Sequence, residues 1–478
     1  MSAINKSNIK YVVIIYITMF MFGLVENLKG VVFPLIKTVY GASYDSQGLL
    51  YSISWYGYVI FCVVCTFVLE RFSIKAAIVS GYALVVISSI LVLFIPNFTV
   101  AVVVMMMVWM GFGFFEVGNN ALATVIFTSS SAIFLNLMHF FYGVGAVLGP
   151  YFASWMISLI NNSFKSPYYP TAVIMAILLI YILCTKFTIQ SSDEEQKATM
   201  TIKDCLKNWL IWYMAFTLGF MEVIEFGASN WGGLYFQDVY GFDIEKEGAT
   251  FVSMFYVLFT VTRLVSGFWI EKLGYMNSIM LYLVLCIIIY IIGFCVGSYG
   301  IWVLPFTGFF IGVLFPTYMC VGMEVFKENA SIATSVIIVI SGATNGLIQY
   351  LVGVINEYIG NEWGYRCNII YTAIPLVLCI PLQCYLKKHF YNKQKKDESK
   401  EEEIKEDENK KDIHIEMTET KKDTKDTTTT TSENNDSNTI IPNDMNTSIN
   451  MPATTLSPTD INKQISTTET SSSSTATN

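Results

Sequence analysis

Residues 99–128 read TVAVVVMMMVWMGFGFFEVGNNALATVIFT, an apolar run that carries one charged residue, Glu116. A helix needs about 20 mainly apolar residues to cross the roughly 30 Å of hydrocarbon in a bilayer. The run is long enough to cross, so we predict a membrane-spanning helix here. Because a charge at the centre of such a helix costs about 2.5–3.5 kcal/mol, Glu116 should face a cavity or a partner.

Runs of this length recur along the chain. The composition agrees with them, because 54% of the 478 residues are hydrophobic and 14% are charged, whereas soluble domains carry about 25% charged residues. The first run follows Lys6 and Lys10 but is too long for a signal peptide, so we expect it to remain as a span. We predict an all-α membrane protein with twelve transmembrane helices, near residues 9–36, 46–69, 74–95, 99–128, 132–160, 168–189, 206–236, 248–270, 275–297, 299–326, 330–356 and 364–386.

A weak internal repeat divides these twelve spans into two groups of six. At an offset of 201 residues, the matching positions are Glu70-Arg71 with Glu271-Lys272, Gly111 with Gly312, Gly145 with Gly346, and Ser52 with Ser253. Parallel six-span halves are a known construction of transporters, and we expect two pseudo-symmetric halves. The expected segments are an N-terminal half, a cytoplasmic inter-half loop, a C-terminal half and a tail, at residues 1–189, 190–205, 206–387 and 388–478.

The charges of the loops predict the orientation. If the N-terminus lies inside, twelve basic residues are cytoplasmic: Lys6, Lys10, Arg71, Lys75, Lys186, Lys197, Lys203, Lys207, Lys272, Lys327, Lys387 and Lys388. The opposite loops then hold four: Lys37, Lys165, Lys246 and Arg366. Cytoplasmic loops of membrane proteins are enriched in Lys and Arg. We therefore expect a multi-pass protein with both termini in the cytoplasm, in the plasma membrane rather than a vacuolar or other endomembrane.

The C-terminal tail has a different character from the rest of the chain. A mixed charge run at residues 395–408 precedes sequence rich in Asn, Thr and Ser, including residues 427–431 and 471–474. Such sequence cannot bury enough apolar surface to offset the entropy of ordering. We predict a disordered tail.

Several classes of function lack their motifs. The chain has no phosphate-binding loop, no H-E-x-x-H and no nucleophile elbow, so we expect no enzyme and no catalytic residues. Cys62 and Cys65 form a C-x-x-C pattern inside an apolar run, which favours packing over a metal or redox site. We expect no metal and no cofactor. The net charge of −8 belongs largely to the tail, and no basic face for nucleic acid is present.

Polar residues inside the predicted spans are the candidates for function. They are Glu26, Asn27 and Lys29 in the first span, Glu116, Asn119 and Asn120 in the fourth, Asn136 and His139 in the fifth, and Glu222, Glu225 and Asn230 in the seventh. One interpretation is a central cavity in which a carboxyl group binds and releases protons. The other is structural, a buried ion pair such as Lys29 with Glu26 or Glu116. We favour function for Glu116 and a structural role for Glu222 and His139.

Aromatic residues lie near the same positions: Trp55, Tyr56, Phe115, Tyr142, Trp231, Tyr235 and Tyr256. Sugars have apolar faces and polar rims, so sugar sites combine aromatic rings with amides and carboxylates. Core filling and interfacial belts are the alternative explanation for aromatics in such a chain. Trp231, beside Asn230 and within two turns of Glu225, is the preferred contact. Arg263 lies near a span end, where snorkelling explains a charge.

Several of these segments resemble known transporters. Residues 267–274, GFWIEKLG, are similar to the G-x-x-x-D-R-x-G loop of the major facilitator superfamily. Within it, three segments resemble the fucose/galactose–proton symporter family and its eukaryotic relatives: FGLVENLKGVVFP at 22–34, GFGFFEVGNN at 111–120, and LNLMH with GVGAVLGP at 135–139 and 143–150. Glu225 with Trp231 and Tyr235 is similar to the seventh span of that family. The resemblance covers residues 9–386.

The resemblance implies the major facilitator fold and sugar transport by alternating access, with Glu116 at the family's proton-binding position. The first-span Asp of the bacterial symporters is Gly30 here, preceded by Lys29. We therefore expect a secondary active transporter of a monosaccharide or similar small polar solute, with protons as a candidate coupling ion. An exporter of drugs or organic anions and a non-transporting nutrient sensor are the alternatives.

The expected site has two groups of residues. The candidates for proton coupling are Glu116 and Glu26. The candidates for binding the solute are Asn27, Lys29, Asn119, Asn120, Asn136, His139, Glu225, Asn230, Trp231 and Tyr235. The expected partners are a small-molecule substrate, a sugar by preference, and the lipid bilayer.

Overall fold

The computed structural model describes residues 8–127, 131–160, 163–187 and 200–391. Residues 190–199 of the predicted inter-half loop (190–205) and residues 392–478 of the predicted tail (388–478) lie outside the described residues. Within the described ranges the regular structure is helical and contains no strand. The prediction of an all-α protein is therefore confirmed.

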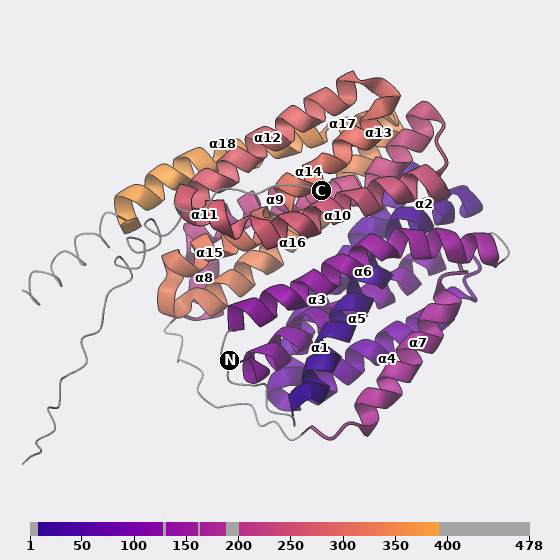
Figure 1. Cartoon of the computed structure of the whole chain (residues 1–478), viewed down its shortest axis with the longest axis horizontal. Coiled ribbons are helices and arrows are strands. Elements are labelled where there is room, and N and C mark those ends of the chain that lie inside the picture. The colour runs from indigo at the N-terminus through magenta and orange to yellow at the C-terminus, as the bar shows by residue number, and fades with distance from the viewer. Residues whose placement is uncertain (1–7, 128–130, 161–162, 188–199, 392–478) are drawn as a thin grey trace, which may run out of the picture. The chain divides into compact units, whose positions relative to one another are not determined.

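The N-terminal half contains the first six predicted spans, drawn from indigo to magenta in Figure 1. Its helices are α1 (Ile9–Glu26), α2 (Lys29–Tyr40), α3 (Tyr44–Arg71), α4 (Ile74–Val92), α5 (Phe98–Ile126), α6 (Ser131–Leu159) and α7 (Tyr168–Cys184). A short helix, α8 (Ile202–Lys207), follows before the second half and occupies the end of the predicted inter-half loop. Thr201 and Asp204 form a capping box at its start.

The C-terminal half contains the other six spans. Its main helices are α9 (Trp209–Tyr240), α10 (Ala249–Val265), α11 (Gly267–Leu273), α12 (Tyr275–Cys295), α13 (Gly300–Val303), α14 (Thr307–Ile311), α15 (Leu314–Phe326), α16 (Ala330–Tyr358), α17 (Trp363–Arg366) and α18 (Asn368–Leu386). Short 3-10 and π-helical turns join or extend them: η2 (Ile244–Gly248), η3 (Gly297–Tyr299), η4 (Leu304–Phe306), η5 (Lys327–Asn329) and η6 (Lys387–Tyr391).

The number of spans agrees with the sequence. In the part of the chain that the structure describes, 11 helical stretches are long and apolar enough to cross a bilayer. The shorter apolar helix α7, with 17 residues, fills the place of the sixth predicted span and is at the lower limit of spanning length. Together these elements give twelve transmembrane helices, and the predicted fold class is confirmed.

Two spans that we predicted as continuous runs are interrupted. In the first, α1 ends at Glu26 and α2 begins at Lys29, so that Asn27 and Leu28 form a turn inside the membrane segment Ile9–Tyr40. The tenth, Gly297–Phe326, is divided into short α and 3-10 pieces around Pro305. Proline has no N–H for the helix ladder, which accounts for the second interruption. The first lies at the candidate site.

The two halves repeat the same helix packing. In the N-terminal half α1 packs against α6, α3 against α5, and α4 against α7. The equivalent pairs of the C-terminal half also pack together: α9 with α16, α10 with α14, and α12 with α18. The halves meet where α3 packs against α16 and where α6 packs against α10. Because α3 is equivalent to α10 and α6 to α16, these two contacts are equivalent as well. The weak sequence repeat therefore corresponds to a structural pseudo-symmetry.

Glycines bring the backbones of α1 and α6 into contact. A Cβ atom at Gly23 would lie 2.0 Å from the Tyr142 carbonyl oxygen, and one at Gly145 would lie 2.1 Å from that of Phe20. Gly149 is similarly close to Leu24. Small residues allow close approach of membrane helices, where dispersion forces rather than water drive association. This contact sets the distance between the candidate residues of the first and fifth spans.

We expect Gly145→Ala to lower the thermal stability of the detergent-solubilised protein, because the new methyl group would overlap the backbone of α1. Overpacking of this kind costs about 1–3 kcal/mol. Gly118→Ala is the matched control, since its Cβ would lie 3.3 Å from the Ile78 Cγ1 atom and 3.7 Å from the nearest backbone atom, the Ile78 nitrogen. Equal melting temperatures for the two variants would show that the α1–α6 backbone contact is not required.

Candidate functional site

The interruption of the first span places three polar residues inside the protein. Glu26 ends α1, Asn27 lies in the turn and Lys29 begins α2. Their exposed fractions are 4%, 1% and 2%. The Asn27 side chain donates a hydrogen bond to the Gly23 carbonyl oxygen at 2.9 Å, which satisfies part of the backbone at the helix end. The turn thus holds two opposite charges a few residues apart in a buried position.

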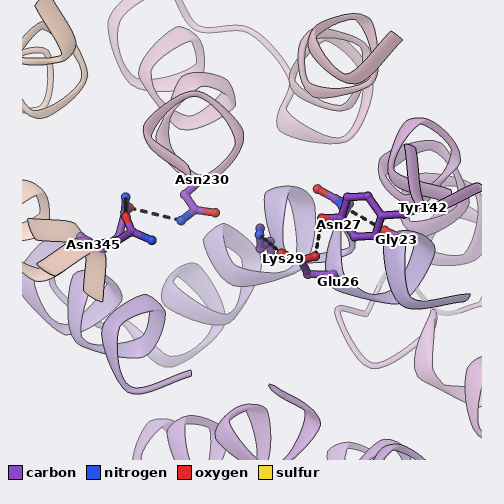
Figure 2. Close-up of polar contacts among 8 residues, drawn as sticks. Gly23, Glu26, Asn27, Lys29, Tyr142, Asn230 and Asn345 are labelled. Carbon is purple, nitrogen blue, oxygen red and sulfur yellow. Dashed lines mark hydrogen bonds and ion pairs between the residues drawn. The ribbon is translucent and has the colours of Figure 1, made fainter. Parts of the chain in front are cut away.

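Glu26 and Lys29 form an ion pair that Tyr142 completes (Figure 2). The Lys29 ammonium donates to Glu26 Oε1 at 2.8 Å. The Tyr142 hydroxyl on α6 donates to Glu26 Oε2 at 2.6 Å. Both oxygens of the buried carboxylate therefore have a donor, as burial of a charge requires. Of the two structural alternatives weighed for Lys29, the pair with Glu26 is the one that forms.

Aromatic rings from both halves surround the Lys29 ammonium. Its nitrogen lies 4.7 Å from the ring centre of Trp109 on α5 and 4.6 Å from that of Phe226 on α9. Trp55 on α3 packs against both rings, with centroid distances of 5.7 Å to Trp109 and 4.3 Å to Phe226. A cation over aromatic faces at this range is attracted by the ring quadrupoles. The ammonium therefore lies where the two halves meet.

The C-terminal half supplies a chain of amides. Gln349 Oε1 on α16 accepts from Trp231 Nε1 at 2.9 Å and from Asn230 Nδ2 at 3.2 Å, both on α9. Gln349 Nε2 donates to Asn345 Oδ1 at 3.3 Å. Figure 2 shows Asn345 and Asn230 toward the left of the view and the Glu26–Lys29 pair near its centre. The α2 backbone also lies against α9 here, because a Cβ at Gly30 would be 3.2 Å from the Ser229 carbonyl oxygen.

Several buried polar atoms around these two groups have no hydrogen-bond partner among the described residues. They are Asn27 Oδ1, Trp55 Nε1, Asn230 Oδ1 and Asn345 Nδ2, with Asn119 Oδ1 and Glu222 Oε2 further along the bundle. An unpaired buried donor or acceptor costs about 1–3 kcal/mol. Donors and acceptors of both kinds, from both halves, are therefore unpaired in this conformation.

Glu116 lies on α5, and its hydrogen-bond partner lies on the same helix. Its Oε1 accepts from Asn120 Nδ2 at 2.9 Å, one turn further along. Its charge interacts with those of Glu26 and Arg263. Asn119 faces a different way, and its amide donates to the Ile15 carbonyl oxygen on α1 at 3.4 Å. Glu116 thus lacks the second donor that Glu26 has in the described part of the chain.

Two further carboxyl groups lie on α9. Glu222 Oε1 accepts from Ser341 Oγ on α16 at 2.9 Å, and its other oxygen is unpaired. Glu225 interacts electrostatically with Arg263 on α10 and with the Glu26–Lys29 pair. Arg263 donates to the Gly312 carbonyl oxygen at 2.9 Å and lies over the Phe259 ring. Snorkelling to the interface, expected from its place near a span end, does not describe this arginine.

The remaining candidates are Tyr235, His139 and Asn136. Tyr235 packs in an aromatic cluster of the C-terminal half, 5.3 Å from Tyr365 and 5.7 Å from Phe294 between ring centres. His139 is half-buried on α6, one turn before Tyr142, and its charge interacts with that of Arg263. Asn136 lies on α6, and its side chain is not among those the structure describes.

Four members of the site were not among the residues predicted from the sequence: Trp109, Phe226, Asn345 and Gln349. Asn345 and Gln349 are amide side chains within an apolar span, as Asn119 and Asn120 are, and this signal would also identify them. Trp109 and Phe226 carry no such signal. Aromatic residues are common in every span, and only the fold shows which ones surround a charge.

At one end of the molecule, Tyr44 joins the halves. As the first residue of α3, it donates its backbone N–H to Glu357 Oε2 on α16 at 2.8 Å, and a carboxylate there also complements the helix dipole. Its hydroxyl donates to Asp238 Oδ2 on α9 at 2.8 Å and accepts from Asn361 Nδ2 at 3.0 Å. Lys37 lies 3.5 Å above its ring centre. We call this group the Tyr44 cluster.

Comparison with known proteins places this arrangement among transporters. A sequence model of the family described as Major Facilitator Superfamily matches residues 15–345. The L-fucose-proton symporter of Escherichia coli (strain K12) is 22% identical over 413 residues, covering 77% of this chain and 88% of its own. The resemblance read from the sequence motifs is confirmed by both matches.

Solved structures share the fold. The crystal structure of the major facilitator transporter FucP in the outward conformation matches with a TM-score of 0.56 and 19% identity, over 78% of this chain and 99% of its own. A bacterial homolog of the human lysosomal transporter Spinster, inward-facing and occupied, matches at 0.64 and 13%, over 82% and 99%. The nucleoside transporter NupG matches at 0.63 and 14%, over 79% and 99%.

We expect Tyr44→Phe to loosen the end of the molecule at which the Tyr44 cluster lies. The change removes the hydroxyl bonds to Asp238 and Asn361. Because each such bond contributes about 1 kcal/mol net, hydrogen exchange at the start of α3 and the end of α16 should accelerate at least about fivefold.

Tyr40→Phe is the matched control. The Tyr40 hydroxyl donates at 2.9 Å to the Ile95 carbonyl oxygen, inside the N-terminal half, so exchange at the end of α16 should not change. Unchanged exchange at that helix end in Tyr44→Phe would mean that the cluster does not hold the halves together.

Proposed function

Because the chain belongs to the Major Facilitator Superfamily, we propose that it is a secondary active transporter of a monosaccharide or a similar small polar solute, working by alternating access. One observation carries the proposal. The Glu26–Lys29–Tyr142 group of one half and the amide chain of the other meet at a helix interruption, with unpaired donors and acceptors between aromatic rings. Such a site binds a solute through contacts from both halves.

The chemistry of the site fits a polyhydroxylated solute. Hydroxyl groups both donate and accept, and the unpaired atoms include donors such as Asn345 Nδ2 and acceptors such as Asn230 Oδ1. Trp55 and Trp109 offer apolar faces beside them. The curated relative from Escherichia coli is named an L-fucose-proton symporter, which supports a sugar as the solute.

An organic anion is the second candidate, because Lys29 places a cation in the site. The ion pair argues against it. Glu26 already balances the Lys29 charge at 2.8 Å, and an incoming anion would have to displace a carboxylate that is held by a second donor, Tyr142. Leaving that carboxylate buried and unpaired is costly. We therefore favour a neutral solute over an anion, and transport over a sensing role without transport.

The orientation predicted from the basic loops assigns a direction to the Tyr44 cluster. With both termini in the cytoplasm, the start of α3 and the end of α16 lie on the outer side. The Tyr44 cluster then closes the outer side in this conformation. Alternating access requires these contacts between halves to break and reform.

We propose Glu116 as the group through which transport is coupled to protons. Its carboxyl is held by one amide from its own helix, Asn120, and it interacts electrostatically with Glu26 and Arg263. A carboxyl with one neutral donor can gain and lose a proton without leaving an opposite charge unpaired. The relative named as a proton symporter supports this role.

The first test is uptake by the purified protein in proteoliposomes. The solutes should include neutral hexoses, deoxyhexoses such as L-fucose, polyols, nucleosides and uronic acids. We expect uptake of a neutral sugar or polyol. Gln349→Leu should reduce it about tenfold or more, because two buried donors, Asn230 and Trp231, lose their shared acceptor.

Gln383→Leu is the matched control, since Gln383 also forms an amide–amide bond, with Asn277 on α12, but outside the site. Uptake by this variant should match the wild type. Preferential uptake of the uronic acids would contradict the proposal and favour the organic-anion alternative.

The second test concerns Glu116. Glu116→Gln imitates the protonated side chain permanently, so uptake driven by a pH gradient should fall sharply while exchange of internal for external solute survives. Glu245→Gln, at the end of the molecule near Asp243, is the control carboxyl outside the site. If the pH dependence of uptake is the same in Glu116→Gln as in the wild type, Glu116 has a structural role.

A further inference from the structure

The Glu26–Lys29 pair is carried entirely by one interrupted helix. The two residues flank the Asn27–Leu28 turn, and the ion pair spans only three positions of the chain. Lys29 is 2% exposed, so its ammonium has little access to water. Its partners are one carboxylate oxygen and the faces of Trp109 and Phe226. Glu26 is the carboxylate with which the buried Lys29 forms its ion pair.

A buried carboxyl group can be neutralised in two ways. It can bind a proton from the water on either side of the membrane, or it can pair with a cation that belongs to the protein. The Tyr142 hydroxyl stabilises the carboxylate but adds no positive charge. At Glu26 the positive charge comes from Lys29, which cannot diffuse away. The pair is also independent of the contacts that open and close, because both residues lie in the same half.

The other charged and titratable groups near Glu26 increase the need for a cation. Two carboxyl groups interact with it electrostatically, Glu116 on α5 and Glu225 on α9. The remaining neighbours are hydroxyls: Tyr142 on α6, Tyr58 on α3 and Tyr256 on α10. Arg263 interacts with Glu225 and Glu116. Lys29 is thus the cation that is paired with Glu26 in the described part of the site.

We propose that the Lys29 ammonium is a resident counter-ion for Glu26 that takes the place of a transported proton, so that Glu26 stays ionised throughout the transport cycle and removing Lys29 converts Glu26 into a proton-binding group. The part of the proposal that concerns the transport cycle rests on the proposed function. The part that concerns the ionisation state of Glu26 does not. Any proton that the cycle moves is then carried by another carboxyl group, and no proton enters or leaves at Glu26.

The decisive measurement is the infrared spectrum of the purified protein, which needs no substrate. A protonated carboxyl group gives a carbonyl band that an ionised one lacks. Across about pH 5.5 to 8, a range that includes shifted carboxyl groups, the wild-type spectrum should contain no band from a protonated Glu26. The wild type and Glu26→Gln should therefore show the same protonated-carboxyl bands. Lys29→Met, which keeps an unbranched apolar side chain of nearly the same length and loses the charge, should gain a band on acidification.

Two further variants assign that band. The double variant Lys29→Met with Glu26→Gln should lack it, because the group that bound the proton is gone. Lys29→Arg, which keeps the positive charge, should resemble the wild type. A protonated Glu26 band in the wild type overturns the proposal, and so does its absence from a folded Lys29→Met. If Lys29→Met does not fold, the wild-type and Lys29→Arg spectra still decide.

Transport gives a second, separate readout. In proteoliposomes, uptake by Lys29→Met should gain a pH dependence of up to about tenfold per pH unit, as expected for one added proton. The double variant should lose this added dependence. An identical pH profile in the wild type and Lys29→Met overturns the proposal. Absence of uptake of every solute by every variant refutes the proposed function instead, and leaves the infrared result to decide the state of Glu26.

Discussion

Hydrocarbon does not form hydrogen bonds, and this constraint shapes the whole molecule. Every backbone group in a span must be paired within its own helix, and every polar side chain must find a partner inside the protein. The first requirement gives a bundle made only of helices in the described residues. The second concentrates the polar side chains at one place. Glycines such as Gly23 and Gly145 make that concentration possible, because backbone contact between α1 and α6 brings Tyr142 within hydrogen-bonding distance of Glu26.

Much of the fold could be predicted from the sequence for the same reason. A span must be long and apolar, so a window of about 20 residues is enough to identify it. Twelve runs, their approximate ends and their division into two sets of six all agree with the structure. The interruptions could not be predicted so easily. Pro305 marks one of them. At the other, Asn27 favours helix caps and turns, but a single Asn in an apolar run does not by itself show that the helix breaks there.

The candidate site was predicted in part. Glu26, Lys29, Glu116 and Asn230 were identified because polar residues in apolar runs are conspicuous. Their partners were harder to predict, because a partner on another helix of the bundle has no fixed spacing in the sequence. The ion pair of Glu26 with Lys29 could be foreseen, since it is local. The donation by Tyr142 and the ring of Phe226 could not, because they depend on which face of α6 and α9 turns inward.

The polar contacts differ according to whether they lie within a half or between halves. The buried ion pair of Glu26 and Lys29 and its hydrogen bond from Tyr142 lie within the N-terminal half. Three tyrosines of α3 reach the other half: Tyr51 and Tyr56 donate to the neutral carbonyl oxygens of Asn230 and Ala343, and Tyr44 bonds to Asp238 and Glu357 near water. Separating the halves then exposes or rehydrates groups that water can satisfy, at a cost of about 1 kcal/mol for each neutral bond. Breaking a buried ion pair would cost several times more. A molecule that keeps its buried ion pair within one half can therefore separate the halves at a low cost in free energy. The ring of Phe226 covers the Lys29 ammonium from the opposite half, so such a movement would remove this contact.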